Sequence, residues 1–194
     1  MNKVSLLVAD CHDSFVYNLV EVLRSFHEVC HFDIAPVEQC LDLPLHNYRG
    51  ILLSPGPGHP EETIGLMPLI KKTYRTHPLL GVCLGHQALT LHFGGGVSQM
   101  PHPLHGHADS IQIIKPNPLF NGFPMDSPIG RYHSWVVDPE QIPKELCVTA
   151  LSRTDGSIMA LRHQSLPIYG VQFHPESYLS PHGATIVRNW VESL

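Results

Sequence analysis

The sequence predicts an α/β fold, with an open, mostly parallel sheet flanked by helices and an antiparallel extension. Two observations support this prediction. Over residues 4–93, strand and helix patterns alternate in the order typical of a parallel α/β sheet. After residue 110, short extended segments follow one another, and Pro, Gly or Asn turns separate several of them, which indicates an antiparallel or mixed continuation.

The first half contains the patterns of buried strands and amphipathic helices. Residues 4–10 form a nearly continuous apolar run, as expected for a strand buried on both faces. Asp13 and Ser14 can cap a helix whose apolar positions continue to Phe26. Further strands are expected at residues 28–34, 50–54 and 79–82, and further helices at 64–74 and 83–93.

The second half is expected to supply short strands and a closing helix. Residues 182–194 place five apolar side chains on one helical face. The chain shows no linker, repeat or low-complexity segment, so we predict a single domain over residues 1–194. The extended candidates are residues 110–114, 129–137, 146–151, 158–162 and 168–173.

Composition and charge argue against several classes of protein. The net charge is −5 and there is no basic block, so no nucleic-acid partner is expected. No apolar run reaches the ~18 residues that span a bilayer, so no membrane association is expected. Residues 1–10 lack a cleavage site and indicate a strand rather than a signal peptide. Five cysteines without C-x-x-C spacing fit a reducing compartment, and we expect a cytoplasmic location.

Fifteen histidines are the one unusual feature of the composition. The densest cluster is His102, His105 and His107, and only Asp109 joins it at a spacing suited to metal ligands. A metal site and a His-rich surface loop are both compatible with this pattern. The loop is favoured, and no metal is predicted.

Residues 81–85, Gly-Val-Cys-Leu-Gly, have the form G-x-C-x-G between a predicted strand and a predicted helix. This is the thiol version of the nucleophile elbow, a sharp turn that presents one side chain above the sheet. The positive end of the helix would favour the thiolate of Cys83, and the N–H of Leu84 would face an oxyanion. The alternative is a small buried cysteine with only a packing role.

Residues 55–58, Pro-Gly-Pro-Gly, leave the end of another predicted strand. Ligands of open α/β sheets bind at the carboxyl ends of strands, where a rigid loop can aim a backbone N–H at a substrate. Because proline has no N–H, Gly56 and Gly58 are the donors available in this motif. Taken alone, the motif is more typical of an ordinary turn.

His174-Pro175-Glu176 ends the last predicted strand. Pro175 disfavours helix at His174, and in an extended chain residues i and i+2 lie on the same side. Glu176 can therefore reach the imidazole, fix its tautomer and stabilise the imidazolium. An isolated His at a strand end is more often a surface residue, but the Cys elbow favours a catalytic base.

Six segments, read together, carry a family resemblance. They are Asp13-Ser14-Phe15 with Tyr17-Asn18-Leu19, Ser54-Pro55-Gly56-Pro57-Gly58, Gly81-Val82-Cys83-Leu84-Gly85-His86-Gln87-Ala88, His105-Gly106, Arg131-Tyr132-His133-Ser134 and Gly170-Val171-Gln172-Phe173-His174-Pro175-Glu176-Ser177. In this order they resemble the class I, triad-type glutamine amidotransferases over nearly the whole chain. The resemblance is strongest to the glutaminase subunits of anthranilate synthase and aminodeoxychorismate synthase.

The resemblance implies a flavodoxin-like fold and a complete site without cofactor or metal. Cys83 would attack the side-chain amide of L-glutamine, His174 would act as base and Glu176 would orient it. The amides of Gly58 and Leu84 would form the oxyanion hole. Glutamine would be held by Gly56, Pro57, Gly58, Gln87 and the backbone around Ser134 and Trp135.

The same resemblance implies a partner. Ammonia would pass to a larger, chorismate-binding synthase subunit, because only neutral NH3 is nucleophilic and release into water would mostly protonate it. The product, anthranilate or aminodeoxychorismate, is left open by the sequence.

The chain departs from the family pattern at three places. Cys11-His12 replaces the frequent Asn-Tyr, and His107 replaces a Lys in a segment expected near the partner. Trp135 replaces a Leu that offers only its backbone to glutamine, so little effect on binding is expected.

Two other functions compete with that of a glutaminase subunit. One is a free-standing Cys hydrolase such as a γ-glutamyl peptidase, and the other is a His-rich metal-binding protein. Gln87 and the Pro-Gly-Pro-Gly loop favour the glutaminase.

Overall fold

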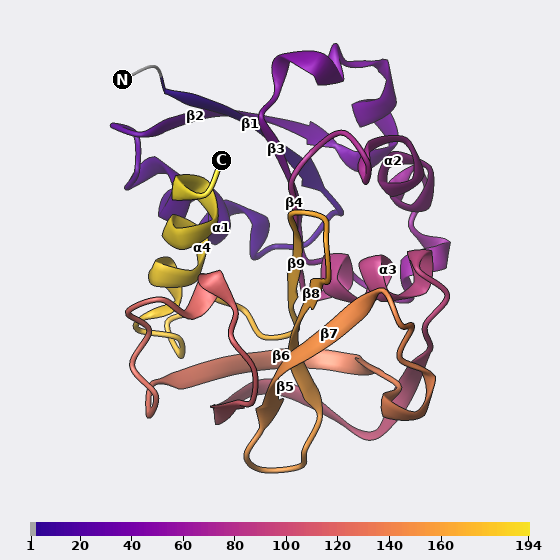
Figure 1. Ribbon diagram of the computed structural model, residues 1–194, viewed down its shortest axis with the longest axis vertical. Coiled ribbons are helices and arrows are strands. Elements are labelled where there is room, and N and C mark those ends of the chain that lie inside the picture. Colours follow the sequence, from indigo (N-terminus) through magenta and orange to yellow (C-terminus); the bar gives the residue numbers. More distant parts are fainter. Residues whose placement is uncertain (1–2) are drawn as a thin grey trace.

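One nine-stranded sheet runs through residues 3–194, the part of the chain that this computed structural model describes (Figure 1). The strand order is β2-β1-β3-β4-β9-β8-β7-β5-β6. The first five strands in this order are parallel, and the remaining four continue the sheet in antiparallel pairs. This topology confirms the predicted fold class. The strands are β1 (Val4–Asp10), β2 (Cys30–Pro36), β3 (Gly50–Leu53), β4 (Leu79–Val82), β5 (Val97–Ile113), β6 (Pro128–Val137), β7 (Leu146–Ser152), β8 (Ile158–His163) and β9 (Ile168–Val171).

Within the described residues, four α-helices cover the two faces of the parallel half of the sheet (Figure 1). Helices α1 (Val16–Arg24) and α4 (Gly183–Glu192) pack on one face. Helices α2 (Leu66–Thr73) and α3 (Leu84–His92) pack on the other. Short 3₁₀ helices join these elements at Val37–Asp42, Leu45–Asn47, Pro60–Glu62, Pro118–Phe120 and Pro139–Gln141.

Two hydrophobic cores lie on opposite sides of the parallel strands. In β1, Leu6 and Val8 belong to the core beneath α1 and α4, whereas Leu7 and Ala9 belong to the core beneath α2 and α3. Successive side chains of a strand point to opposite faces, so a strand covered on both sides needs apolar residues throughout. This double burial explains the unbroken apolar run of residues 4–10.

The expectation for the middle of the chain was wrong in one respect. A strand was predicted only at residues 110–114, but β5 begins at Val97 and has 17 residues. Most of its side chains are exposed, and it contains Pro101, Pro103 and Gly106. The hydrophobic alternation that marks a half-buried strand is therefore missing, and backbone pairing with β6 holds the segment extended.

Two other strands have a boundary two residues away from the prediction, and the remaining strands agree to within one residue. The strand expected at 28–34 lies at 30–36, and the strand expected at 168–173 ends at Val171. Residues 1 and 2 of the predicted domain lie outside the described part of the chain.

The parallel half of the sheet brings several chain segments to one edge. The carboxyl ends of β1, β3, β4 and β9 lead directly into Cys11, Ser54, Cys83 and Gln172. Neighbouring parallel strands place such ends side by side, which is where open α/β sheets bind ligands. The candidate site is therefore expected at this edge.

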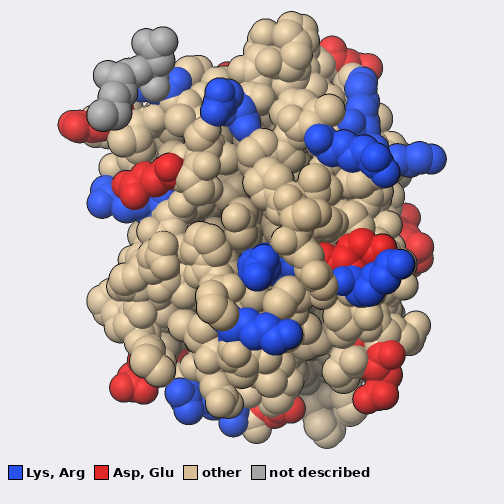
Figure 2. All heavy atoms as spheres, viewed as in Figure 1, with Lys and Arg blue, Asp and Glu red and all other residues tan. Residues whose placement is uncertain are grey.

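Charged side chains are scattered on the face seen in Figure 2. Lys and Arg alternate there with Asp and Glu, and other residues form most of the surface. Among residues 3–194, none of the helices combines the length and the hydrophobicity that a membrane span requires.

Candidate active site

Cys83 occupies a sharp turn between β4 and α3. Its backbone has φ +51° and ψ −100°, a conformation that non-glycine residues rarely adopt. A side chain at Gly81 would have its Cβ only 2.5 Å from backbone atoms of Gly85, and one at Gly85 would lie 2.5 Å from the carbonyl oxygen of Leu53. The two flanking glycines are therefore required for the strand, turn and helix to approach this closely.

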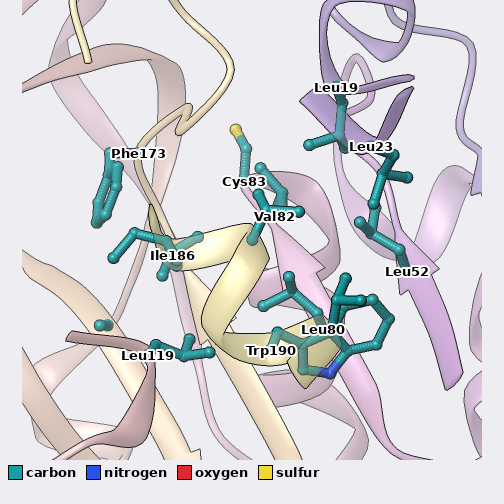
Figure 3. Close-up of a cluster of buried hydrophobic side chains, with 14 of the residues drawn as sticks. Leu19, Leu23, Leu52, Leu80, Val82, Cys83, Leu119, Phe173, Ile186 and Trp190 are labelled. Atoms are coloured by element: carbon teal, nitrogen blue, oxygen red, sulfur yellow. The ribbon is translucent and has the colours of Figure 1, made fainter. Parts of the chain in front are cut away.

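The turn directs the Cys83 sulfur away from the core. In Figure 3 the sulfur points away from Val82 and Leu80, which lie in the hydrophobic core. The backbone N–H of Cys83 donates to Val171 O at 2.8 Å, so β9 holds the turn in place. Leu84 is the first residue of α3, and its N–H has no acceptor within the helix. A thiolate and an oxyanion are both stabilised at such a helix end.

The Pro-Gly-Pro-Gly loop packs directly against this turn. A Cβ at Gly56 would lie 2.4 Å from the Leu84 side chain and 2.8 Å from Cys11 O. Gly58 has φ +72°, in the left-handed region that favours glycine. The buried Ser54 hydroxyl accepts from the Cys11 N–H at 2.8 Å and so joins the ends of β1 and β3. The loop is thus a fixed part of the wall beside Cys83.

His174 and Glu176 are in contact, although the backbone between them differs from the expected strand. Nδ1 of His174 lies 2.8 Å from Oε1 of Glu176, and both side chains are buried. His174 forms one bridge with Gly130, and the chain then turns, with Ser177 N–H donating to His174 O at 3.2 Å. A turn, not a continued strand, therefore brings the carboxylate to the ring.

The ring of His174 is fixed by aromatic neighbours. Its centroid lies 4.9 Å from that of Phe15 and 5.2 Å from that of Tyr132. Burial alone would lower the pKa of His174, but the adjacent Cys83 and Glu176 outweigh it and raise this pKa well above 6.5. Nε2 of His174 is buried without a hydrogen-bond partner among the described residues. A raised pKa favours the protonated ring, so Nε2 is the nitrogen that would hold a proton taken from Cys83.

A cavity of about 460 Å³ opens where these groups meet. Cys83 and His174 line the same cavity, with Tyr132 O 4.0 Å from the Cys83 sulfur. Its volume suits a small molecule such as an amino acid. Of the residues predicted for the site, Gly56, Pro57, Gly58, Cys83, Gln87, Ser134, Trp135 and His174 line the cavity, whereas Leu84 and Glu176 are not among its lining residues.

Sequence reasoning missed a buried ion-pair network behind β6. The guanidinium of Arg131 is fully buried, and it lies 2.8 Å from a carboxylate oxygen of Asp109 and 3.0 Å from one of Asp155. Burial would raise the pKa of Asp109, but hydrogen bonds from Ser152, Thr154 and Arg131 lower it. Arg131 appeared in the family segment, but residues 109 and 155 are too distant in sequence to reveal the pairing.

His133 joins this network to the cavity wall. Burial first, and the nearby Arg131 charge second, lower the pKa of His133 to about 3, so its ring is neutral near pH 7. Arg131 Nε donates to His133 Nε2 at 3.1 Å, and His133 Nδ1 lies 3.0 Å from Trp135 O. The ring therefore sits between a fixed donor and a fixed acceptor.

The side chain of Trp135 has a contact that was not anticipated. Its ring meets that of His59 edge to face, with centroids 4.9 Å apart. His59 directly follows Gly58, so the indole packs against the end of the Pro-Gly-Pro-Gly loop. The expectation that Trp135 contributes only its backbone omitted this contact.

His86, on α3, is expected to make folding sensitive to acid. It is fully buried, and neither ring nitrogen has a hydrogen-bond partner within residues 3–194. Burial lowers the pKa of His86 to about 3. Between pH 6.5 and 3 the unfolded chain binds a proton that the folded chain does not, so stability is complete above pH 6.5 and falls with decreasing pH.

Replacing His86 by Leu should therefore flatten the dependence of unfolding free energy on pH. Between pH 6.5 and 3, the slope of unfolding free energy against pH should fall by up to about 1.4 kcal/mol for each pH unit. Urea unfolding at several pH values measures it. His27→Leu, at an exposed position, is the matched control. An unchanged slope in His86→Leu would contradict the prediction that His86 makes folding sensitive to acid.

The side chains of the described residues form no cluster suited to bind a metal ion. No group of three or more His, Cys, Asp or Glu within residues 3–194 could hold a metal ion. His102, His105 and His107 lie on the largely exposed strand β5.

The comparisons with known proteins agree with this fold. The family described as "Glutamine amidotransferase class-I" matches residues 7–194, and the chain belongs to this family. It is 41% identical over 192 residues to "Anthranilate synthase component 2" of Azospirillum brasilense, covering 97% of this chain and 95% of that protein. It is 37% identical over 191 residues to "Aminodeoxychorismate/anthranilate synthase component 2" of Bacillus subtilis, covering 97% and 96%.

A solved structure supports the fold independently. The crystal structure of a glutamine amidotransferase from Thermotoga maritima aligns with a TM-score of 0.74 at 21% identity, covering 100% of this chain and 83% of that chain. At this identity the likeness shows the shared fold alone.

Proposed function

We propose that the chain hydrolyses L-glutamine to glutamate and ammonia with Cys83, His174 and Glu176 as catalytic triad. The observation that carries the proposal is the single cavity where Cys83 and His174 meet. Glu176, at 2.8 Å from His174 Nδ1, leaves Nε2 as the nitrogen that exchanges protons with the sulfur and the substrate. A nucleophile, an oriented base and a nearby helix N-terminus are the elements of acyl transfer.

The chemistry proceeds in two halves. The Cys83 thiol transfers its proton to His174 Nε2, and the thiolate attacks the side-chain amide carbon of glutamine. The amides of Gly58 and Leu84 stabilise the oxyanion, His174 returns the proton to the leaving nitrogen, and ammonia departs. Water, deprotonated by His174, then cleaves the γ-glutamyl thioester and regenerates the thiol.

Substrate binding is assigned to the rest of the cavity wall. Gly56, Pro57 and Gly58 lie beside the nucleophile, and Gln87, Ser134 and Trp135 line the cavity as well. These residues surround a space of about 460 Å³, which accommodates one amino acid.

The ammonia is proposed to pass to a larger, chorismate-binding synthase subunit. Both similar proteins named above are second components of a synthase, which supports a partner that carries the other half of the reaction. Their names cover anthranilate and aminodeoxychorismate, so both products fit. We further propose that residues 1–194 act as one amidotransferase domain, because one sheet links both halves of the described chain.

A γ-glutamyl chloroketone, an alkylating analogue of glutamine, should label Cys83 ahead of the other four cysteines. Cys83 lines the cavity, whereas burial raises the pKa of both Cys11 and Cys40 to about 12. Burial also raises the pKa of Cys30, and Cys147 is half-buried on β7. Peptide mass spectrometry after limited labelling measures the distribution.

Glutamine should protect Cys83 from this label, and asparagine, one methylene shorter, should protect less. Preferential labelling of another cysteine, or equal labelling with and without glutamine, would contradict the proposal. Purification of the chain from its native cell, followed by identification of a bound synthase subunit, tests the partner separately.

A further inference from the structure

The Cys83 sulfur has a side-chain donor that the triad does not include. Nε2 of Gln172 lies 3.6 Å from the sulfur, within hydrogen-bond distance for a sulfur acceptor. Gln172 directly follows β9, whose last residue, Val171, accepts the Cys83 N–H. Its side chain is fully buried, and its own N–H donates to Met159 O at 2.9 Å. The amide is therefore held next to the nucleophile.

Neighbouring groups that can act only as donor or only as acceptor determine which side-chain atom of Gln172 faces the sulfur. A guanidinium only donates, so the contact from Arg131 Nε makes His133 Nε2 an acceptor. A neutral imidazole with Nε2 as acceptor carries its hydrogen on Nδ1. His133 Nδ1 therefore donates to Trp135 O, at 3.0 Å.

The Trp135 carbonyl also determines the orientation of the Gln87 side-chain amide. Trp135 O only accepts, so the group of Gln87 that lies 2.8 Å from it is the NH2. The same Nε2 lies 3.1 Å from Gln172, which must present its oxygen there. The NH2 of Gln172 then faces the Cys83 sulfur. Each hydrogen-bond donor between Arg131 and Cys83 is thus identified from a guanidinium or a carbonyl, groups whose roles as donor or acceptor cannot change.

We propose that Gln172 is a further catalytic residue, whose side-chain N–H stabilises the Cys83 thiolate, and that Gln87 is a positioning residue for it. When the thiol proton moves to His174 Nε2, the negative sulfur keeps a donor that is already oriented. A hydrogen bond to a charged acceptor is stronger than one to a neutral acceptor. The proposal deepens the proposed function, on which it rests for the identity of the nucleophile.

Other groups around the sulfur do not supply this side-chain donor. Tyr132 O, 4.0 Å away, can only accept, and His133 stays neutral because its pKa is lowered to about 3. His174, backed by Glu176, takes the proton, and Asp13 and His105 lie on the cavity wall. Gln172 is thus the side-chain donor that faces the sulfur from β9.

Gln172→Met tests the proposal, since it preserves length and removes the N–H. The rate of Cys83 alkylation by iodoacetamide is measured against pH on the full chain. We expect the midpoint of the profile to move by about one pH unit to the alkaline side, with a roughly tenfold lower rate at pH 7. Gln112→Met, an exposed position on β5, is the matched control and should leave the profile unchanged.

Gln172→Leu provides a second variant. It removes the N–H without adding an ionisable group and should move the profile as far, so the inference is tested even if Gln172→Met does not fold. Circular dichroism verifies folding of each variant. An unchanged pH profile of alkylation in a folded variant overturns the proposal. This holds even if glutamine turnover falls, because a merely structural role of Gln172 would lower turnover without moving the profile.

The alkylation readout does not depend on the substrate. A shifted profile in a chain that does not hydrolyse glutamine would refute the proposed function and support the role of Gln172. An unshifted profile in a chain that does hydrolyse glutamine would support the proposed function and refute the role of Gln172.

Discussion

Cys83→Ala is expected to abolish glutamine-dependent synthesis by the complex with its partner, by more than about 10³-fold. In the proposed mechanism the Cys83 sulfur is the atom that forms the thioester, and alanine offers no nucleophile in its place. Synthesis from added ammonium salts at alkaline pH should persist, because in the proposed function the partner subunit carries out that reaction. Paired assays with glutamine and with ammonia on the reconstituted complex measure the two rates.

Alanine is a safe replacement at this turn. Cys83 is small, and its sulfur points away from the core in Figure 3, so packing changes little. Cys147→Ala, at the half-buried position on β7, is the matched control and should keep both activities. A Cys83→Ala complex that uses glutamine at the full rate would show that the nucleophile has been assigned wrongly. Loss of both activities would indicate a failure of assembly instead.

Arg131→Met is expected to destabilise the fold by about 3–5 kcal/mol, the largest stability effect anticipated for a single replacement here. The guanidinium is fully buried and holds Asp109, whose side chain is 1% exposed. Without Arg131, that carboxylate stays buried without its cation, and Asp155 loses the same partner. The free energy of unfolding from urea denaturation at pH 7 measures the effect.

Arg24→Met serves as the comparison. Arg24 pairs with Glu21 on the surface of α1, and both side chains are more than half exposed. Such pairs contribute only about 0–1 kcal/mol, because water screens them. Equal losses from both replacements would show that Asp109 is not stabilised by Arg131.

The Arg131 network also connects stability with the site. Arg131 sets the tautomer of His133, and His133 donates to the carbonyl of Trp135, on the cavity wall. Arg131 pairs with His107 across β5 and β6, next to an irregularity in the register of the two strands. His107 is one of the residues that depart from the family pattern. His107 on β5 is thus paired with Arg131, the residue that orients His133 at the cavity wall.

Local sequence was sufficient for the elbow and its elements. The apolar runs of β1, β3 and β4 have strand length and are bounded by Gly, Pro or Asp, so the strands could be predicted without a structure. Gly81 and Gly85 around Cys83 predicted a tight turn, and the structure shows the close backbone approach that excludes a Cβ there. These features depend on residues within a few positions of one another.

The part of strand β5 before residue 110 could not be predicted, because its residues carry little information of their own. Its exposed side chains and two prolines do not favour a strand, and pairing with β6 makes it one. The hydrogen bond from Gln172 to Cys83 joins residues 89 positions apart. Contacts of that kind exist only after the parallel strands β4 and β9 have aligned.

The sequence alone therefore determined the fold class, the elbow and the His174–Glu176 pair, since each is encoded by a periodicity or by a short local spacing. Tertiary structure decided which side chains surround the sulfur and which of their atoms face it. The physical reason is that Arg131 sets the hydrogen-bond direction at His133, and the Trp135 carbonyl sets it at Gln87 and, through Gln87, at Gln172. These contacts have no counterpart in the linear order of the residues.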